Sequence, residues 1–193
     1  MLPLNYIIHS VMAAGRMIKF DGNAINDFDI SERGFWRSFF AAVLVLPFSL
    51  MMAASRYDLI TDGVSIGVIS NDIPFGRFMF VEMVAYVISW TAYPVLMSVF
   101  VKHLNCQQNY IRGVVAYNWS SFWQNAVYVP LALVSAESGG PFALIVLVAV
   151  LAYGWFVAWK GFGVSKFQAF MLIGLDLSIG IIISFWANRI VLG

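Results

Sequence analysis

The sequence carries little charge. Asp, Glu, Lys and Arg make up 11% of its 193 residues, whereas 61% of the residues are apolar. Soluble globular domains carry roughly 25% charged residues, so water is an unsuitable solvent for most of the surface of this chain. The formal net charge of +1 provides no basic field that would hold nucleic acid. We therefore expect a membrane protein with no nucleic-acid partner.

Cysteine and histidine are also scarce. Cys106 is the single cysteine, which excludes an internal disulfide and the paired cysteine spacings of zinc and iron–sulfur sites. The two histidines, His9 and His103, have no ligand partners at metal-binding spacing, and the P-loop, G-x-S-x-G, H-E-x-x-H and Rossmann glycine patterns are missing. These absences predict a non-enzymatic protein with no cofactor, no metal and no catalytic residues.

Long apolar stretches predict an all-α fold, a polytopic bundle of about five transmembrane helices. A span needs roughly 20 apolar residues, and such stretches occur at about 35–54, 78–101, 114–134, 142–159 and 167–187. Pro47 predicts a kink in the first span. The polar stretch from Ser55 to Arg77 predicts a loop with at most a short interfacial segment. Glycine-rich turns at 138–141 and 161–163 predict that the last three spans are antiparallel neighbours.

The first 34 residues form a separate segment before the transmembrane domain of residues 35–193. They lack the apolar core and cleavage site of a secretory signal. Apolar residues at helical spacing predict an amphipathic helix lying in the membrane interface: Leu4, Ile7, Ile8, Val11, Met12 and Ile18. Asp29 and Ser31 are two candidate N-caps for the helix that follows.

Basic residues predict the orientation of the bundle, because cytoplasmic loops carry an excess of Lys and Arg. With a cytoplasmic N-terminus and five spans, the inner side holds eight basic residues, and they are Arg16, Lys19, Arg33, Arg37, Lys102, Arg112, Lys160 and Lys166. The outer side holds Arg56, Arg77 and Arg189. This asymmetry places the C-terminus on the outer side.

Two acidic residues fall inside predicted spans, where a charge costs about 2.5–3.5 kcal/mol at the helix centre. Glu82 lies near the outer end of its span, within reach of water or headgroups. Asp176 lies near the midplane, at a depth similar to that of Gln124 and Asn125, so burial favours its neutral, protonated form. Three roles remain open for Asp176: structural hydrogen bonding to Gln124 or Asn125, a proton or ion relay, and a contact with a partner protein.

Further polar features lie in the same spans. Tyr93, next to Pro94, predicts a kink and a hydroxyl that faces the bundle interior. Gly180 and Ser184 continue the Asp176 face of the last span, and such a stripe of small residues allows another helix to approach closely.

The layout of the chain resembles the Yip1-type family of small five-span membrane proteins. The stretches that carry the resemblance are FDGNAINDFDISERGFWRSFFAA (20–42), GVVAYNWSSFW (113–123) and KGFGVSKFQAFMLIGLDL (160–177). The first of them is most similar to alphaproteobacterial members, which implies a location in the bacterial inner membrane with a periplasmic C-terminus. Bacterial members mostly lack an assigned function, so the resemblance implies no activity.

Two functional hypotheses follow from the sequence. The first is a structural or accessory component of a homo-oligomer or of a larger membrane complex, which contacts membrane lipids and other membrane subunits. The second is a small transporter or channel subunit that uses a mid-membrane polar site around Asp176.

Overall fold

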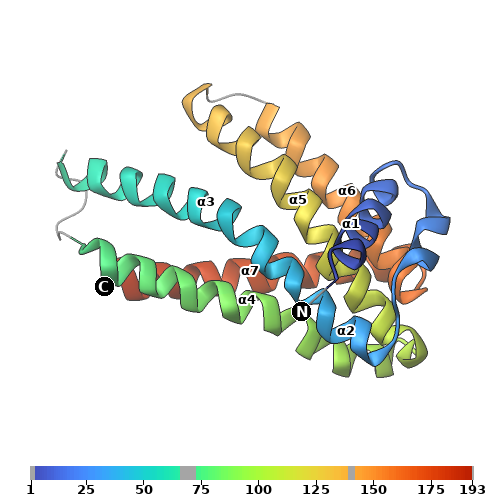
Figure 1. Ribbon diagram of the computed structural model, residues 1–193. Coiled ribbons are helices and arrows are strands. Elements are labelled where there is room, and N and C mark those ends of the chain that lie inside the picture. The colour runs from blue at the N-terminus through green and yellow to red at the C-terminus, as the bar shows by residue number, and fades with distance from the viewer. Residues whose placement is uncertain (1–2, 66–72, 139–141, 193) are drawn as a thin grey trace.

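The computed structural model describes residues 3–65, 73–138 and 142–192, and within them the chain is helical and contains no strand. Seven α-helices and two 3-10 helices follow one another along the chain (Figure 1): α1 (Leu4–Ile18), η1 (Gly22–Asp27), α2 (Glu32–Ser38), α3 (Phe40–Ser65), α4 (Phe75–His103), η2 (Gln107–Asn109), α5 (Tyr110–Ser138), α6 (Phe142–Phe162) and α7 (Lys166–Leu192). The all-α prediction is confirmed.

Four helical segments of the described residues are long and apolar enough to cross a membrane: 32–63, 75–103, 144–162 and 166–192. They fall on four of the five predicted spans. The remaining predicted span, 114–134, lies within α5, which is as long as α4 but carries polar residues through its middle. A transmembrane role for α5 therefore stays a prediction.

Helix α5 is the central element of the bundle. It packs against α6, α3, α1, α2 and α4. Asn118, Trp119 and Ser120 are fully buried in these contacts, and Asn118 Nδ2 donates a hydrogen bond to Ser38 Oγ at 2.9 Å. Because other helices cover α5, it needs fewer apolar residues than a helix that faces lipid.

The predicted loop between the first two spans is partly wrong. Helix α3 continues through the polar stretch as far as Ser65, and α4 begins at Phe75. Tyr57 Oη donates to the carbonyl of Ile73 at 3.0 Å, which links the two helices across the connection. Residues 66–72 lie outside the described residues, as does most of the predicted turn at 138–141.

Helix α2, which leads into the predicted first span, has the N-cap that the sequence predicts. Ser31 is its N-cap, because Ser31 Oγ accepts a hydrogen bond from the Gly34 amide at 3.0 Å. Asp29 acts one step earlier, since its Oδ1 accepts from the Ser31 amide at 3.0 Å. The chain then breaks at Phe39 between α2 and α3, so that the predicted first span is divided into a short helix and a long one.

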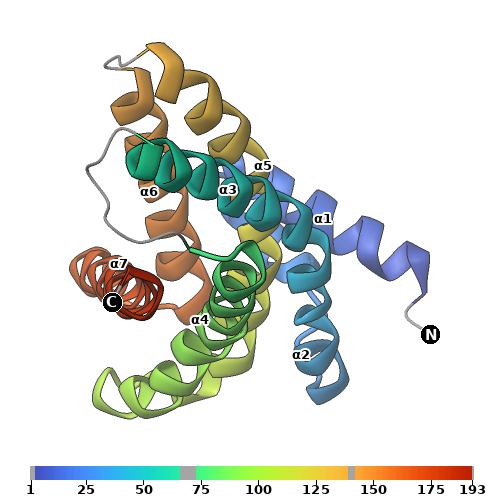
Figure 2. The ribbon, with the colours of Figure 1, turned by 90° about the vertical axis from the view of Figure 1, so that its left-hand side faces the viewer.

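Helix α1 occupies the segment predicted to be amphipathic and runs across the long helices rather than along them (Figure 2). Its small residues Ser10, Ala13 and Ala14 are buried, and Trp123 Nε1 donates to the carbonyl of Val11 at 2.8 Å. Of the predicted apolar face, Leu4, Ile8, Met12 and Ile18 remain exposed. Their exposure is compatible with the interfacial location, which stays a prediction.

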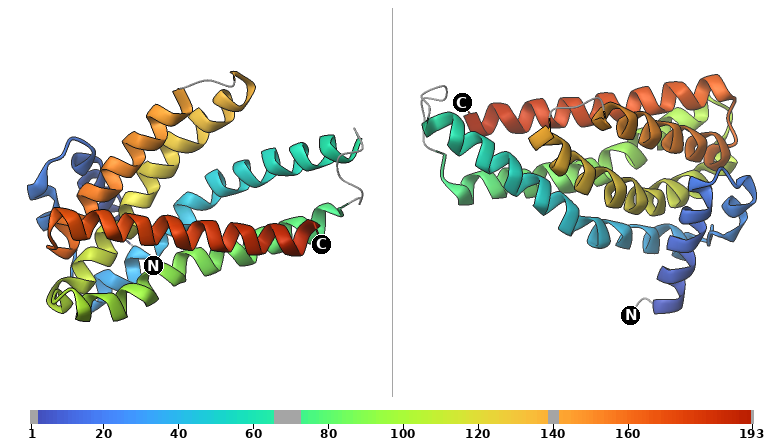
Figure 3. Two further views of the ribbon diagram at one scale, coloured as in Figure 1. Left: turned by 180° about the vertical axis from the view of Figure 1, so that it is seen from behind. Right: turned by 90° about the horizontal axis from the view of Figure 1, so that it is seen from above.

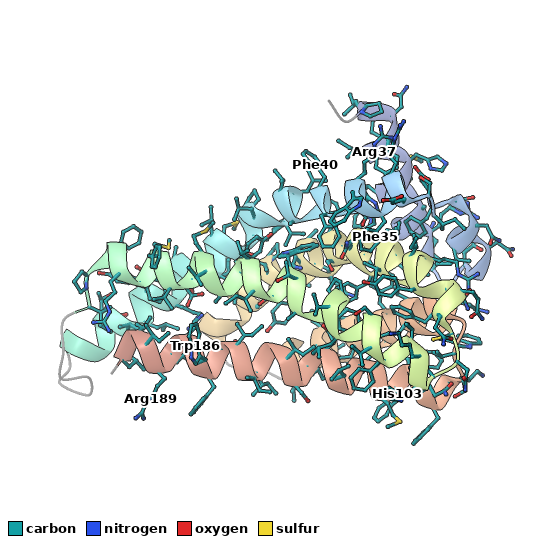
Figure 4. All side chains as sticks on the ribbon, turned by 90° about the horizontal axis from the view of Figure 1, so that it is seen from below. Phe35, Arg37, Phe40, His103, Trp186 and Arg189 are labelled. Carbon is teal, nitrogen blue, oxygen red and sulfur yellow. The ribbon has the colours of Figure 1, made fainter. Side chains whose placement is uncertain are left out.

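The basic residues gather at one end of the bundle. Arg37 and His103 lie at this end, whereas Trp186 and Arg189 lie toward the other end (Figure 4). We call the first the basic end. The helix ends and the short connections that carry all eight basic residues of the predicted inner side lie there. The turn from α6 to α7 also lies at the basic end, with Gly163 at φ +65°.

Candidate functional site

The long helices pack tightly at the basic end and diverge toward the opposite end, where α5 and α6 separate from α4 and α7 (Figure 3). Polar side chains from α3, α4, α5 and α7 line the space between them. Two groups of charged or ionisable residues occupy this region, one around Asp176 and one around Arg56.

Asp176 lies about ten residues along α7 from Lys166, which corresponds to roughly 15 Å of helix and to the middle of a bilayer core about 30 Å thick. Tyr117 Oη donates a hydrogen bond to Asp176 Oδ1 at 2.7 Å. The Tyr117 ring in turn stacks on Tyr93, with ring centroids 4.2 Å apart and an interplanar angle of 23°. Tyr93 and Asp176, both expected at the site, are thus joined through Tyr117.

Gln124 and Asn125 each line a cavity together with Asp176, but the hydrogen bond that was expected from one of them to its carboxyl group comes from another residue. Gln124 and Asp176 both line a cavity of about 300 Å³. Asn125 and Asp176 both line a larger cavity of about 820 Å³. Asn125 Nδ2 donates to the carbonyl of Ser121 on its own helix at 2.8 Å. The hydrogen bond expected from Gln124 or Asn125 to the carboxyl of Asp176 is made by Tyr117 instead.

Glu82 belongs to a second polar group, between α3, α4 and α7. Arg56 Nη1 lies 2.8 Å from Glu82 Oε1, and Arg56 Nη2 donates to Asn188 Oδ1 at 2.6 Å. The side chain of Glu82 is only 17% exposed, so contact with water or headgroups alone does not account for it. An ion pair of this kind compensates the cost of placing either charge between the helices.

Three neighbouring cavities border the two groups. Arg56 and Glu82 line the first, of about 240 Å³, and Tyr117 and Gln124 line the second, of about 280 Å³. Asp176 and Asn188 line the third. Ser89 and Asn125 line all three, so the cavities are neighbours that share part of their lining. Together we call them the polar groove.

The polar groove ends at the Tyr93–Tyr117 stack. Beyond the stack, toward the basic end, lie apolar side chains with almost no exposure: Met97 is 0% exposed, Val101 3% and Phe162 1%. Phe162 also lines the separate cavity of about 300 Å³ that Gln124 shares with Asp176. The polar groove therefore approaches Asp176 from the side of Arg56 and stops there.

Comparison with known proteins does not identify the chain. No family model, no curated protein and no solved structure matches it. The resemblance to the Yip1-type family therefore stays a prediction, and the function has to be argued from the polar groove.

Several residues of the polar groove were not predicted from the sequence. Arg56 and Asn188 fall outside the apolar centres of the predicted spans, and Tyr117 lies in a segment whose aromatic residues suit the membrane interface equally well. The spacing of seven residues between Tyr117 and Gln124 was the available signal, because it places both on one face of a helix. Within the described residues, no group of three His, Cys, Asp or Glu side chains could hold a metal ion.

Proposed function

We propose that this chain is a small integral membrane transport protein or channel subunit, in which the polar groove admits a proton, an ion or a small polar solute to Asp176. The observation that supports the proposal is the set of polar side chains shared by the neighbouring cavities at the Arg56–Glu82 pair and at Asp176, among them Ser89 and Asn125. Ionisable residues inside a membrane are costly and usually mark transport pathways. Serine, asparagine and tyrosine side chains along the polar groove provide hydrogen bonds for a species in transit.

Flux through reconstituted protein tests this proposal. Proteoliposomes that contain the purified chain should dissipate an imposed proton or ion gradient faster than protein-free liposomes, as measured with pH-sensitive and potential-sensitive dyes. Asp176→Asn, which is isosteric, should lower the excess flux at least tenfold. Ser178→Ala on the exposed side of the same helix is the matched control and should leave the flux unchanged. An excess flux equal in both variants, or no excess flux at all, would overturn the proposal.

A second function, as a subunit of a homo-oligomer or of a larger membrane complex, is favoured by the outer face of α7. A Cβ atom added at Gly174 would meet nothing within 4 Å, and Phe170 and Ile181 on the same face are 68% exposed. Small residues on an uncovered face allow a second helix to approach closely. An added Cβ atom at Gly180 would also meet nothing within 4 Å, and Gly180 and Ser184, the stripe expected to allow this approach, line the polar groove as well.

The oligomeric state tests this second function. After extraction in a mild detergent, the particle mass should exceed that of one chain, and Gly174→Leu should reduce it to the monomer. A strictly monomeric wild-type particle with no co-purifying protein would contradict it.

The cellular location is also part of the proposal. The concentration of basic residues at the basic end favours a cytoplasmic basic end in a bacterial inner membrane. In this orientation the polar groove opens toward the periplasm.

A further inference from the structure

We infer that the species bound at Asp176 is a proton, and that it reaches the carboxyl from the Arg56 side only. This inference rests on the proposed transport function and names both its substrate and its direction of access.

The polar groove offers few of the ligands that a metal cation requires. Calcium takes six to eight oxygen ligands, and magnesium needs a near-octahedral set. The two cavities at Asp176 provide a single carboxyl group, one of whose oxygens already accepts the Tyr117 hydrogen bond. The other oxygen ligands there are neutral side chains such as those of Asn125 and Ser184. A proton needs only one acceptor oxygen, and Asp176 Oδ2 is such an acceptor.

Among the described residues that line the two cavities at Asp176, none has a cationic side chain. The titratable groups that face it are Tyr93 from α4 and Tyr117 and Tyr128 from α5, whereas α6 contributes apolar side chains. Arg56 lies at the far end of the polar groove and is paired with Glu82. A carboxylate in this position has no counter-ion, so binding of a proton removes the cost of an unpaired charge at the midplane.

The proton exchange at Asp176 is a simple acid–base step. A hydronium ion in the polar groove transfers a proton to Asp176 Oδ2. An O–H bond forms on the carboxyl group, an O–H bond of hydronium breaks, and a neutral water molecule is left behind. Tyr117 Oη continues to donate to Oδ1, so the carboxyl keeps its position in both states. The reverse transfer returns the proton to the same water.

The barrier toward the basic end is the layer of Tyr93, Met97, Val101 and Phe162, each at most 3% exposed. The cavity that Phe162 shares with Asp176 is bounded on the α6 side by apolar side chains such as Leu147 and Leu151. Side chains packed at this density leave no path for water. Access from the basic end therefore requires that the stacked tyrosines separate, and in the present structure they are in contact.

Sided cysteine labelling tests the direction of access. In a Cys106→Ser background, Ser89→Cys places a thiol in the polar groove, Val87→Cys places one on the exposed face of the same helix, and Met97→Cys places one in the packed layer. A charged, membrane-impermeant thiosulfonate should label Ser89→Cys from the Arg56 side only, and should label the other two variants from neither side. Labelling of Ser89→Cys from the basic end, from both sides or from neither would overturn the one-sided access.

Infrared spectroscopy of the full chain in liposomes tests the identity of the bound species. The carbonyl stretch of a protonated carboxyl group that disappears in Asp176→Asn should titrate with pH, and millimolar sodium or calcium at constant pH should leave it unchanged. Loss of this band on addition of either cation would overturn the proton assignment. A titrating band in a protein without flux would leave the proton site standing and remove the transport function, so that the two failures are distinguishable.

Discussion

Tyr117 is the residue on which the geometry of Asp176 depends. Its hydroxyl makes the hydrogen bond to the carboxyl, and its ring lies against Tyr93. One side chain therefore both positions the acid and closes the polar groove. These two roles can be separated, because the phenylalanine variant keeps the ring and loses the hydroxyl.

We expect Tyr117→Phe to lower the free energy of unfolding by about 0.6 kcal/mol and by no more than roughly 1.7, the range of interhelical hydrogen bonds inside membranes. Flux should change more than stability, since the carboxyl of Asp176 loses its anchor. Denaturant titration in detergent measures the first quantity and the dye assay the second. Tyr93→Phe keeps the stacked ring and leaves the Asp176 bond untouched, so a similar loss of flux in that variant would argue against the positioning role.

The Arg56–Glu82 pair stabilises the contact of α3 with α4, and through Asn188 it also reaches α7. Glu82→Gln should lower the free energy of unfolding by about 1.5–3 kcal/mol, the contribution of hydrogen bonds to charged groups, and values near the lower limit are expected because Arg56 is 33% exposed. A thermal melt in detergent measures the loss. The double variant with Arg56→Gln should recover part of it, and strictly additive losses would show that the two charges do not interact.

At the scale of helices, the sequence predicts the existence of the elements better than their limits. Four predicted spans coincide with helices that can cross a membrane, because a long apolar run has few alternatives to a buried or lipid-facing helix. The extension of α3 through Arg56 to Ser65 was predicted as a loop. Polar composition suggested a loop there, yet the exposed polar side chains and the Arg56 contacts are compatible with a helix end that leaves the apolar core.

The residues of the site that the sequence predicts are those that contrast with their neighbours. Asp176, Tyr93, Gln124 and Asn125 stood out because each is polar within an apolar run. Arg56 and Asn188 have no such contrast with their neighbours, and only the three-dimensional packing of α3 on α4 and of α4 on α7 brings them to the polar groove.

The crossing of α5 and α6 depends on glycine. A Cβ atom at Gly113 would lie 2.2 Å from the ring of Phe162, whereas one at Gly174 in α7 would meet nothing within 4 Å. Gly113→Ala should therefore lower the free energy of unfolding by about 1–3 kcal/mol through overpacking. Gly174→Ala, the matched control, should raise it by up to roughly 1 kcal/mol, because alanine favours the helix. Equal effects in denaturant titration would show that α5 and α6 do not approach this closely.

The connection after α1 is held by charge. Arg16 forms hydrogen-bonded ion pairs with Asp21 and Asp27, and the Arg16 guanidinium, with help from the Asn23 amide, lowers the pKa of Asp21 below its ordinary value of 3.8. A lowered pKa in the folded state means that Asp21 stabilises the fold above pH 3.8 and that this contribution is lost as the pH falls through the lower value. Pepsin should therefore cut the segment between α1 and α2 faster near pH 3 than near pH 5, when each cleavage rate is divided by the rate on a reference peptide substrate at the same pH. Arg16→Ala should abolish most of this difference.

At the scale of the whole molecule, the distribution of charge and the polar groove agree on one direction. The long helices pack closely at the end where Arg37 lies and diverge toward the end where Arg189 lies (Figure 3, Figure 4), and the cavity of the polar groove that Arg56 and Glu82 line belongs to the diverging part. A bundle that is closed on its basic side and open on the opposite side has two different faces in the membrane. Its function therefore depends on a single orientation, which positive charge is well suited to impose.

The predicted orientation requires an odd number of membrane crossings. It therefore depends on whether α5 crosses the membrane. Reporter fusions at the two ends should report opposite sides of the membrane, with the N-terminus in the cytoplasm, because α5 turns four crossings into five. Its central packing against α1, α2, α3, α4 and α6 favours this outcome, since a helix surrounded by spans has to share their direction. Substitution of Lys19, Arg33 and Arg37 by Gln should increase the inverted fraction, whereas substitution of Arg77 and Arg189 should not. Reporters on the same side would mean an even number of crossings and would separate the polar residues of α5 from those of α4 and α7, so that Tyr117 could not reach Asp176 within the membrane.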